Sequence, residues 1–165
     1  MPEKKTVERA REAKREGKSP STQAGEFVRE EIHHIREGKH GASSPEQAIA
    51  IGLSKARRAG VDLPAPEKGE ASEETRAKAK SDLEKGDHPR RKTSAKRSRA
   101  STRKLKRKGT SAASKSALAK HAKKAARKRT ASDRSASARK AARTKGPAAR
   151  SRAAQKAART RARRK

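Results

Sequence analysis

The sequence predicts an all-α protein, in which a small two-helix hairpin follows a solvated helix and precedes a long, largely disordered basic tail with helical tendency. Three observations lead to this prediction. Only 28% of the 165 residues are hydrophobic, with one Phe and no Tyr, Trp or Cys. The formal net charge is +31, and chains that combine high charge with low hydrophobicity bury too little apolar surface to offset the entropy of ordering. Large apolar residues recur at helical spacing only between residues 19 and 61.

Residues 1–18 form the first expected segment. The run EKKTVERAREAKRE at 3–16 consists mainly of helix formers and is followed by Gly17. Val7 is its only large apolar side chain. We therefore expect a helix that is exposed to solvent on all sides.

Residues 19–66 are expected to form the hairpin. Ser19 and Pro20 suit the start of its first helix, and an apolar stripe then runs at helical spacing up to Gly38. Ser44–Gln47 reads as a capping box for the second helix, and Gly60 suits its end. The stripe of the first helix consists of Ala24, Phe27, Val28, Ile32 and Ile35, and the inner face of the second consists of Ala48, Ile49, Gly52, Leu53 and Ala56.

The hairpin has few large apolar side chains. At about 1.5–3 kcal/mol for each fully buried side chain, their burial barely matches the entropy lost by the ordered residues. We therefore expect the hairpin to be completed by homo-oligomerisation or by folding on a partner.

A mixed-charge linker at 67–88 and a basic tail at 89–165 complete the chain. Within the linker, Ser72 can cap a short solvated helix that ends near Gly86. The tail holds 31 Lys and Arg against the single acid Asp133. Ala, Lys and Arg favour helix, with plausible short helices at 112–129, 134–143 and 148–163. Repulsion between like charges opposes these helices in free solution, so we expect the tail to be disordered until it meets a polyanion.

A repeat marks the tail. AKKAARK at 122–128 returns as ARKAART at 138–144 and as AQKAART at 154–160. Each copy combines dense positive charge with small alanine spacers, a pattern suited to following a phosphate backbone. A patch at the end of the second hairpin helix either contacts phosphates or only complements the helix dipole. The candidate nucleic-acid-binding residues are Lys55, Arg57 and Arg58 of this patch, and Lys123, Lys124, Arg127, Lys128, Arg139, Lys140, Arg143, Lys156, Arg159, Arg161, Arg163 and Arg164 of the tail.

The expected partner is nucleic acid. Polycations bind it by releasing counterions, without reading the sequence. Because the chain has one aromatic residue, it lacks stacking platforms for single strands and the aromatics of common RNA-recognition sheets. Duplex DNA is thus the first choice and structured RNA the second. No membrane partner is expected, because the tail lacks the apolar face that interfacial helices bury.

Two resemblances bear on this prediction. The tail resembles the Lys/Ala-rich tails of linker histones and of histone-like bacterial proteins. Residues 21–64, with the run QAIAIGLSKARRAG at Gln47–Gly60, resemble a family of small basic bacterial proteins of unknown function, some of them labelled DNA-binding or plasmid-stabilisation proteins. The resemblance implies a bacterial cytoplasmic protein and supplies no catalytic residues.

Two further groups of residues invite a chemical interpretation. In the cluster of Glu30, Glu31, His33, His34 and His40, the i,i+4 pair Glu30 and His34 could share a metal with His40. Adjacent polar residues on a solvated helix face explain the cluster better, and we expect no metal or cofactor. The loop Gly38–Gly41 could cradle a phosphate, although a loop with two glycines is more often a helix stop.

The sequence thus predicts a non-catalytic, nucleoid-associated, histone-like protein that binds DNA without sequence preference. A base-reading helix-turn-helix is not expected, because the hairpin loop is longer than that motif's turn. Two alternatives remain open. One is an RNA- or ribosome-associated factor, and the other is a protein-interaction module in plasmid maintenance or stress response.

Overall fold

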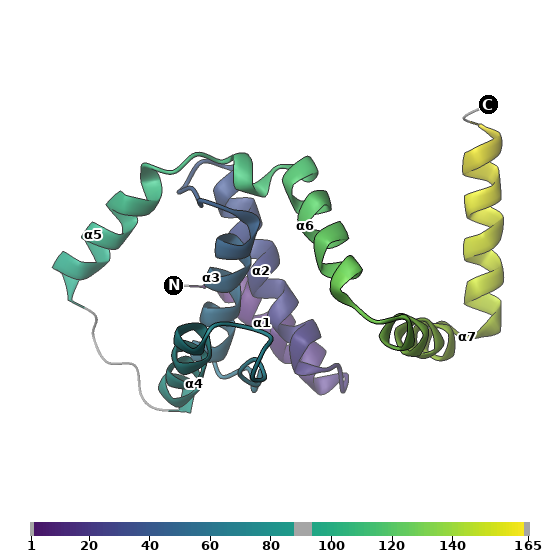
Figure 1. Cartoon of the computed structure of the whole chain (residues 1–165), viewed down its shortest axis with the longest axis horizontal. Coiled ribbons are helices and arrows are strands. Elements are labelled where there is room, and N and C mark those ends of the chain that lie inside the picture. Colours follow the sequence, from purple (N-terminus) through teal and green to yellow (C-terminus); the bar gives the residue numbers. More distant parts are fainter. Residues whose placement is uncertain (1, 88–93, 164–165) are drawn as a thin grey trace. The chain divides into compact units, whose positions relative to one another are not determined.

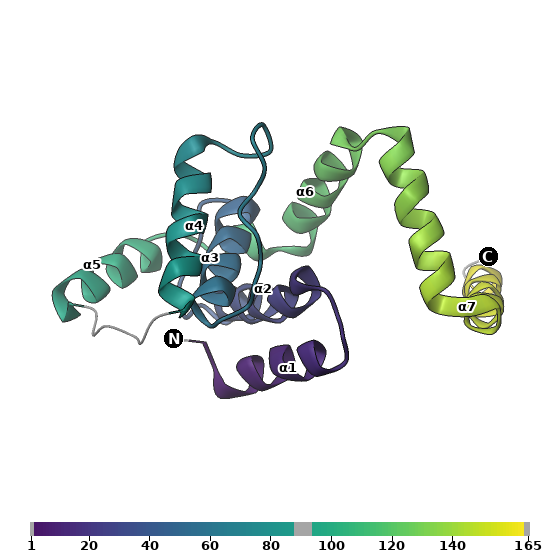
Figure 2. The same ribbon diagram turned by 90° about the horizontal axis from the view of Figure 1, so that it is seen from below.

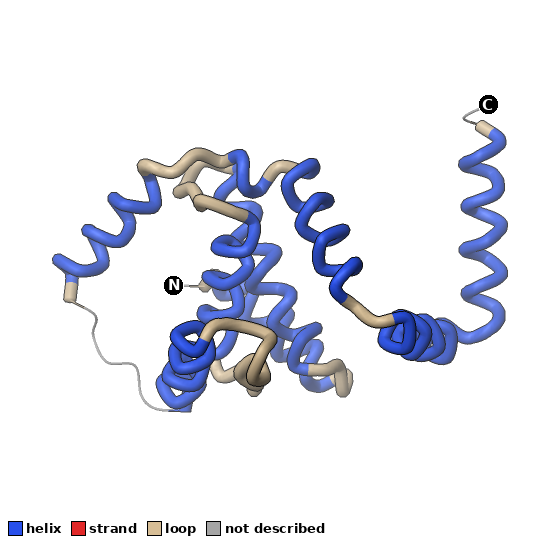
Figure 3. Tube along the Cα trace, in the orientation of Figure 1, coloured by secondary structure: helices blue, strands red, loops and turns tan. Residues whose placement is uncertain are grey.

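The computed structural model describes residues 2–87 and 94–163, and within these ranges the chain is helical without a β-strand (Figures 1 and 3). Contacts divide the chain into two units, residues 1–121 and residues 122–165, which are described separately. The helical class agrees with the sequence, but the expected extent of folded structure was wrong. The elements are α1 (Lys4–Arg15), α2 (Pro20–Arg36), α3 (Pro45–Arg58), α4 (Glu73–Asp87), α5 (Ala95–Lys106), the 3₁₀ turn η1 (Ser111–Ala113), α6 (Lys115–Lys128) and α7 (Ala131–Ala162).

Helices α2 and α3 form the centre of the first unit and begin where the sequence indicates. Pro20 opens α2, and the Ser44 side chain accepts a hydrogen bond from the backbone N–H of Gln47 at the start of α3. The two helices meet at Gly52, where an added Cβ would lie 2.7 Å from the Val28 Cα. Only glycine permits such an approach, so Gly52 sets the spacing of the pair.

Helix α1 is not the solvated helix that the sequence predicts. It packs along α2 (Figure 2) and buries Thr6, Ala10 and Ala13. Ala10 joins a core cluster with Phe27 of α2. The buried residues lie four and three positions apart, so they form one helix face. Because all three are small, a search for large apolar side chains overlooks that face.

Helix α4 packs against α3 (Figure 2) and is likewise not solvated. It buries Ala79 and Asp82, and the Asp82 carboxylate accepts a 2.6 Å hydrogen bond from the Ser54 hydroxyl of α3. Near the end of α4, an added Cβ on Gly86 would lie 2.3 Å from the Arg57 carbonyl oxygen. The Ser72 cap is confirmed by a hydrogen bond from the Thr75 N–H to the Ser72 side chain.

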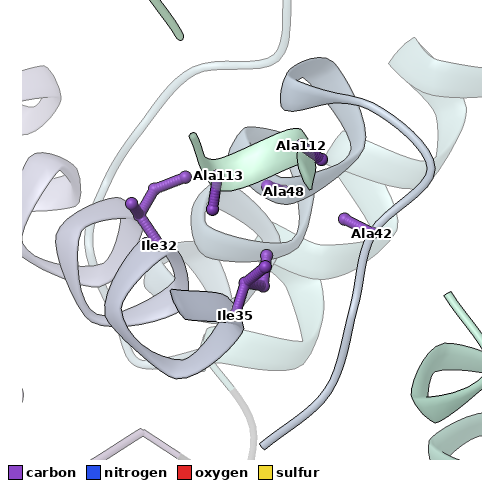
Figure 4. Close-up of a cluster of buried hydrophobic side chains, with 6 residues drawn as sticks. All are labelled: Ile32, Ile35, Ala42, Ala48, Ala112 and Ala113. Carbon is purple, nitrogen blue, oxygen red and sulfur yellow. The ribbon is translucent and has the colours of Figure 1, made fainter. Parts of the chain in front are cut away.

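The beginning of the basic tail is part of the folded core. Ala112 and Ala113 of η1 pack against Ile32 and Ile35 of α2 (Figure 4). Ala113 has no exposed surface, and its carbonyl accepts a 2.8 Å hydrogen bond from Arg36 Nε. Small side chains let η1 lie close to the two helices. The first unit is thus more than a two-helix hairpin, and the chain itself supplies contacts for which oligomerisation was expected.

Most of residues 122–163 are helical, so the prediction of a disordered tail was wrong. No residue of this segment whose burial the structure describes is buried, and its helices therefore depend on local factors. Ala, Lys and Arg have high helix propensity, and each like-charge pair costs only about 0.2–0.5 kcal/mol. At the start of α7, Thr130 and Asp133 form a reciprocal capping box. The prediction weighed the missing core too heavily against propensity and capping.

The expected interruption near residues 144–147 is confirmed in a milder form. Helix α7 continues through this segment but is kinked at Gly146, whose φ of 66° and ψ of 168° are not helical. Pro147, the next residue, lacks a backbone N–H for the helix ladder. The kink separates the second copy of the repeat from the third.

Candidate nucleic-acid interface

Exposed cations dominate residues 122–163. This range contains 16 Lys and Arg and one acid, and every cationic side chain that the structure describes there is exposed. Among the described residues of this range there is no ion pair between side chains. The side chains therefore keep their charge available to an external anion. Arg164, one of the predicted contacts, lies outside the described residues.

The first two copies of the repeat each present their charge along one side of a helix. In α6, Lys123, Lys124, Arg127 and Lys128 fall within about 140° of the helix circumference at 100° per residue. Arg139, Lys140 and Arg143 of α7 are exposed and fall within about 100° by the same count. The sequence prediction that each copy is a cationic module therefore fits the helical geometry.

The third copy belongs to a narrower stripe. Lys156 and Arg159 share one side of α7 with Arg152 and Arg163, and the four fall within about 60°. All four are exposed. Arg161 lies about 140° from Lys156 on the same helix, outside this stripe. Arg152 was not among the predicted residues, although its place four residues before Lys156 is a readable signal.

The second and third copies have the same local structure. The hydroxyl of Thr144 donates a 3.0 Å hydrogen bond to the Lys140 carbonyl, and that of Thr160 donates a 2.9 Å bond to the Lys156 carbonyl. Each threonine ends its copy of the repeat. The threonines therefore bond within their helices, and the Lys and Arg side chains supply the charge of the surface.

The predicted patch on α3 is engaged within the first unit. Lys55 pairs with Glu31. The buried Arg57 donates 3.0 Å hydrogen bonds to the carbonyls of Leu63 and Pro64, and burial lowers its pKa against the opposing effect of Asp82. Arg58 lies 3.5 Å from Asp82 and is half exposed. Lys55 and Arg57 are thus engaged within the fold, whereas Arg58 keeps about half of its side chain exposed beside Asp82.

Helix α5 carries cations that the repeat-centred prediction missed. No residue of α5 is buried. Arg99, Arg103, Lys106 and Arg107 line a shallow hollow together with Ser98 and Thr102. Their spacing of four, three and one residues places them on one side of the helix. That spacing is visible in the sequence, but it lies outside the copies of the repeat.

No protein-family model matches the chain, and no curated protein or solved structure is significantly similar to it. The resemblances seen in the sequence therefore stay predictions. The function must be argued from the residues of this chain alone.

The glycine loop after α2 packs against residues 105–109. Gly38, with a φ of 72°, ends α2. The Gly41 N–H donates a 3.1 Å hydrogen bond to the Leu105 carbonyl, and an added Cβ on Gly41 would overlap the Lys108 carbonyl. The loop is thus a helix stop and a docking point for residues 105–109, and its Gly41 N–H is not available to a phosphate.

Most of the acidic and histidine residues that the sequence assigned to a solvated face are buried or half-buried, contrary to that interpretation. Glu30 is 7% exposed and Glu31 has no exposed surface. His34 and His40 are largely buried, whereas His33 is exposed. Glu31, His34 and His40 offer ligand atoms that lie within 4.8 Å of one another. The structure therefore assembles a cluster that the sequence spacing alone did not favour.

Among the described helices, none combines the length and the apolar character that a membrane span requires.

Proposed function

We propose that this protein binds nucleic acid through its C-terminal helices, with duplex DNA as the preferred partner and phosphates as the contacted groups. The observation that carries the proposal is the positive charge of residues 122–163, which is exposed and unpaired wherever the structure describes the side chain. In the first unit, by contrast, carboxylates pair with several cations, as in the pairs Lys55–Glu31 and Arg58–Asp82. The second unit has one acid, which caps its own helix.

The binding is expected to be insensitive to base sequence. The side chains of the repeat are Lys, Arg, Ala and Thr with one Gln, Gln155. The cations form stripes along helices with no aromatic residue to stack on a base. Such stripes neutralise phosphates and release counterions. Phosphate contacts position a protein on a duplex without carrying sequence information. The helices are already formed, so the free energy of binding is not reduced by the cost of nucleating them.

The proposed role is a binding role without a catalytic step. A protein with these properties coats duplex DNA, and in a bacterial cell this places it in the cytoplasm on the nucleoid. The resemblance of the tail to linker-histone tails supports the same role. Structured RNA presents the same phosphates and is the second candidate partner, because no described residue of the tail selects against a 2′-hydroxyl.

A charge-neutralisation experiment tests the proposal. The triple variant Arg139→Gln/Lys140→Gln/Arg143→Gln removes one stripe of α7. If all three contact phosphates, the slope of log K against log salt for a random duplex should become shallower by about 2.7, at about 0.9 per phosphate. The matched control Arg9→Gln/Arg11→Gln/Lys14→Gln removes the same charge from exposed positions of α1 and should change the slope by less than one.

Competition experiments complete the test. Random-sequence duplex should displace any labelled duplex with equal efficiency, and a strong preference for one sequence would refute the mechanism. Equal phosphate concentrations of duplex DNA and folded RNA rank the two partners. If α1 neutralisation weakens binding as much as α7 neutralisation does, the assignment of the interface to the C-terminal helices fails.

A further inference from the structure

A cluster of three side chains lies where α2 meets the loop that follows it. Glu31 and His34 are three residues apart on α2 and so share one helix face, and His40 reaches the same point from the loop. One potential ligand atom from each residue lies within 4.8 Å of the other two. The imidazole rings of His34 and His40 are nearly perpendicular, with centroids 6.4 Å apart. Two imidazoles and a carboxylate thus converge from two segments of chain.

The hydrogen bonds of His40 leave one ring nitrogen facing the carboxylate. Its Nδ1 lies 3.2 Å from the Gly41 carbonyl oxygen, which can only accept, so Nδ1 carries the proton. Nε2 lies 2.9 Å from Glu31 Oε1. With Nδ1 protonated, a neutral imidazole presents a lone pair at Nε2, and the carboxylate presents another. Two lone pairs that face each other repel, whereas a cation placed between the two atoms attracts both.

The carboxylate of Glu31 is buried and has one oxygen without a hydrogen-bond partner. Its side chain is 1% exposed, and Oε1 makes no hydrogen bond, since its approach to His40 is not aligned for one. The other oxygen, Oε2, accepts a hydrogen bond from Lys55 Nζ. Lys55 therefore fixes the carboxylate so that Oε1 points into the cluster. A buried carboxylate oxygen without a partner costs free energy unless a proton donor or a metal ion satisfies it.

The surroundings of His34 match those of a metal ligand. Its Nε2 lies 3.0 Å from Glu3 Oε1 and its Nδ1 lies 3.9 Å from Glu30 Oε1. A hydrogen bond from Nε2–H to Glu3 leaves Nδ1 unprotonated. Imidazole ligands of metals commonly donate their other N–H to a carboxylate or a backbone carbonyl. His34 has such a carboxylate partner in Glu3, and His40 has a backbone carbonyl partner in Gly41.

We propose that Glu31, His34 and His40 form a binding site for a divalent transition metal ion, of which zinc is the best match. Imidazole nitrogens with one carboxylate oxygen are ligands that suit zinc, and three protein ligands leave a position for water or an external group. The site consists of residues of the first unit alone, and the proposal does not depend on nucleic-acid binding.

Calorimetric titration of the full-length protein with Zn²⁺ tests this site. We expect one ion per chain, and no comparable binding of Mg²⁺, which prefers oxygen ligands and octahedral geometry. His40→Ala removes a ligand from the loop without altering a helix, and it should weaken Zn²⁺ binding at least tenfold. His33→Ala is the matched control, because His33 is an exposed neighbour on α2, and it should leave the affinity unchanged.

A spectroscopic measurement on the unaltered protein guards against a variant that fails to fold. Zn²⁺ at this site should shift the imidazole proton signals of His34 and His40 in the NMR spectrum much more than those of His33 and His121. Absence of stoichiometric Zn²⁺ binding overturns the proposal. Retention of full affinity in His40→Ala, or larger Zn²⁺-induced shifts at His33 or His121 than at His34 and His40, overturns it equally.

Discussion

The close approach of α2 and α3 predicts opposite effects for two glycine-to-alanine substitutions. Gly25 is an exposed interior residue of α2, and an added Cβ would meet no atom within 4 Å. Gly25→Ala should therefore stabilise the protein by about 1 kcal/mol, which is the difference in helix propensity. Gly52 is an interior residue of α3, where the same Cβ would lie 2.7 Å from the Val28 Cα and 3.0 Å from its backbone nitrogen.

Backbone atoms cannot move aside as a flexible side chain can, so Gly52→Ala should force the two helices apart. Overpacking of this kind costs about 1–3 kcal/mol. The gain in helix propensity is the same in both variants. The difference between their free energies of unfolding therefore measures the cost of the close contact between α2 and α3 alone. We expect Gly52→Ala to be less stable than Gly25→Ala by about 1–3 kcal/mol, which corresponds to about 4 °C or more in Tm.

Differential scanning calorimetry of the full chain is the suitable assay, since the packed helices of the first unit give the cooperative transition. Helices without a core contribute little to a sharp heat-absorption peak. Equal Tm values for the two variants would show that α2 and α3 do not meet at Gly52, and the packing described for the first unit would then be incorrect.

Three further predictions concern the docked segment and the helix caps. Ala113→Glu should destabilise the first unit by more than about 2 kcal/mol in denaturant titrations, because it places a charge at a fully buried position; an unchanged midpoint would refute the docking of η1. The pKa of Glu46 is lowered to about 2, first by a backbone hydrogen bond and then by His121, so the stability that it contributes is present above the ordinary carboxyl pKa and lost as the pH falls toward 2. His121→Ala should raise that pKa in an NMR titration, whereas an unaltered titration would rule out the contact. Thr130→Ala should cost about 1 kcal/mol of helix stability by removing a cap, seen as lower helicity in circular dichroism, and equal helicity would argue against the capping box.

Local signals in the sequence predicted the central helices well. Pro20, Ser44 and Gly60 mark helix ends through their own backbone chemistry, and Phe27 and Ile35 identify the buried face of α2. Such signals act within a few residues, so they can be interpreted without knowledge of the fold.

The sequence did not predict which other segments cover these helices. The buried faces of α1 and η1 consist of small residues such as Ala10 and Ala113, and alanine is as common in the exposed helices. Whether an alanine is buried depends on contacts between segments distant in the chain. The T-x-x-D box at Thr130–Asp133 was a readable signal that the disorder prediction overlooked.

For the candidate sites too, local features could be predicted from the sequence and contacts between distant segments could not. The charge of the tail is a property of composition and could be predicted, and the helical stripes follow once helix is assumed. The engagement of Arg57 and the convergence of His34 with His40 depend on the tertiary fold. In both cases a residue's chemistry was visible in the sequence, but its partner lay elsewhere in the chain.

The salt dependence of duplex binding by the full-length protein tests the central claim most directly. If the exposed cations of residues 122–163 neutralise six to ten phosphates, log K against log salt should be linear with a slope between about −5 and −9. A slope near zero, or no binding of duplex DNA or RNA in dilute buffer, would contradict the assignment of these helices as a phosphate-binding surface.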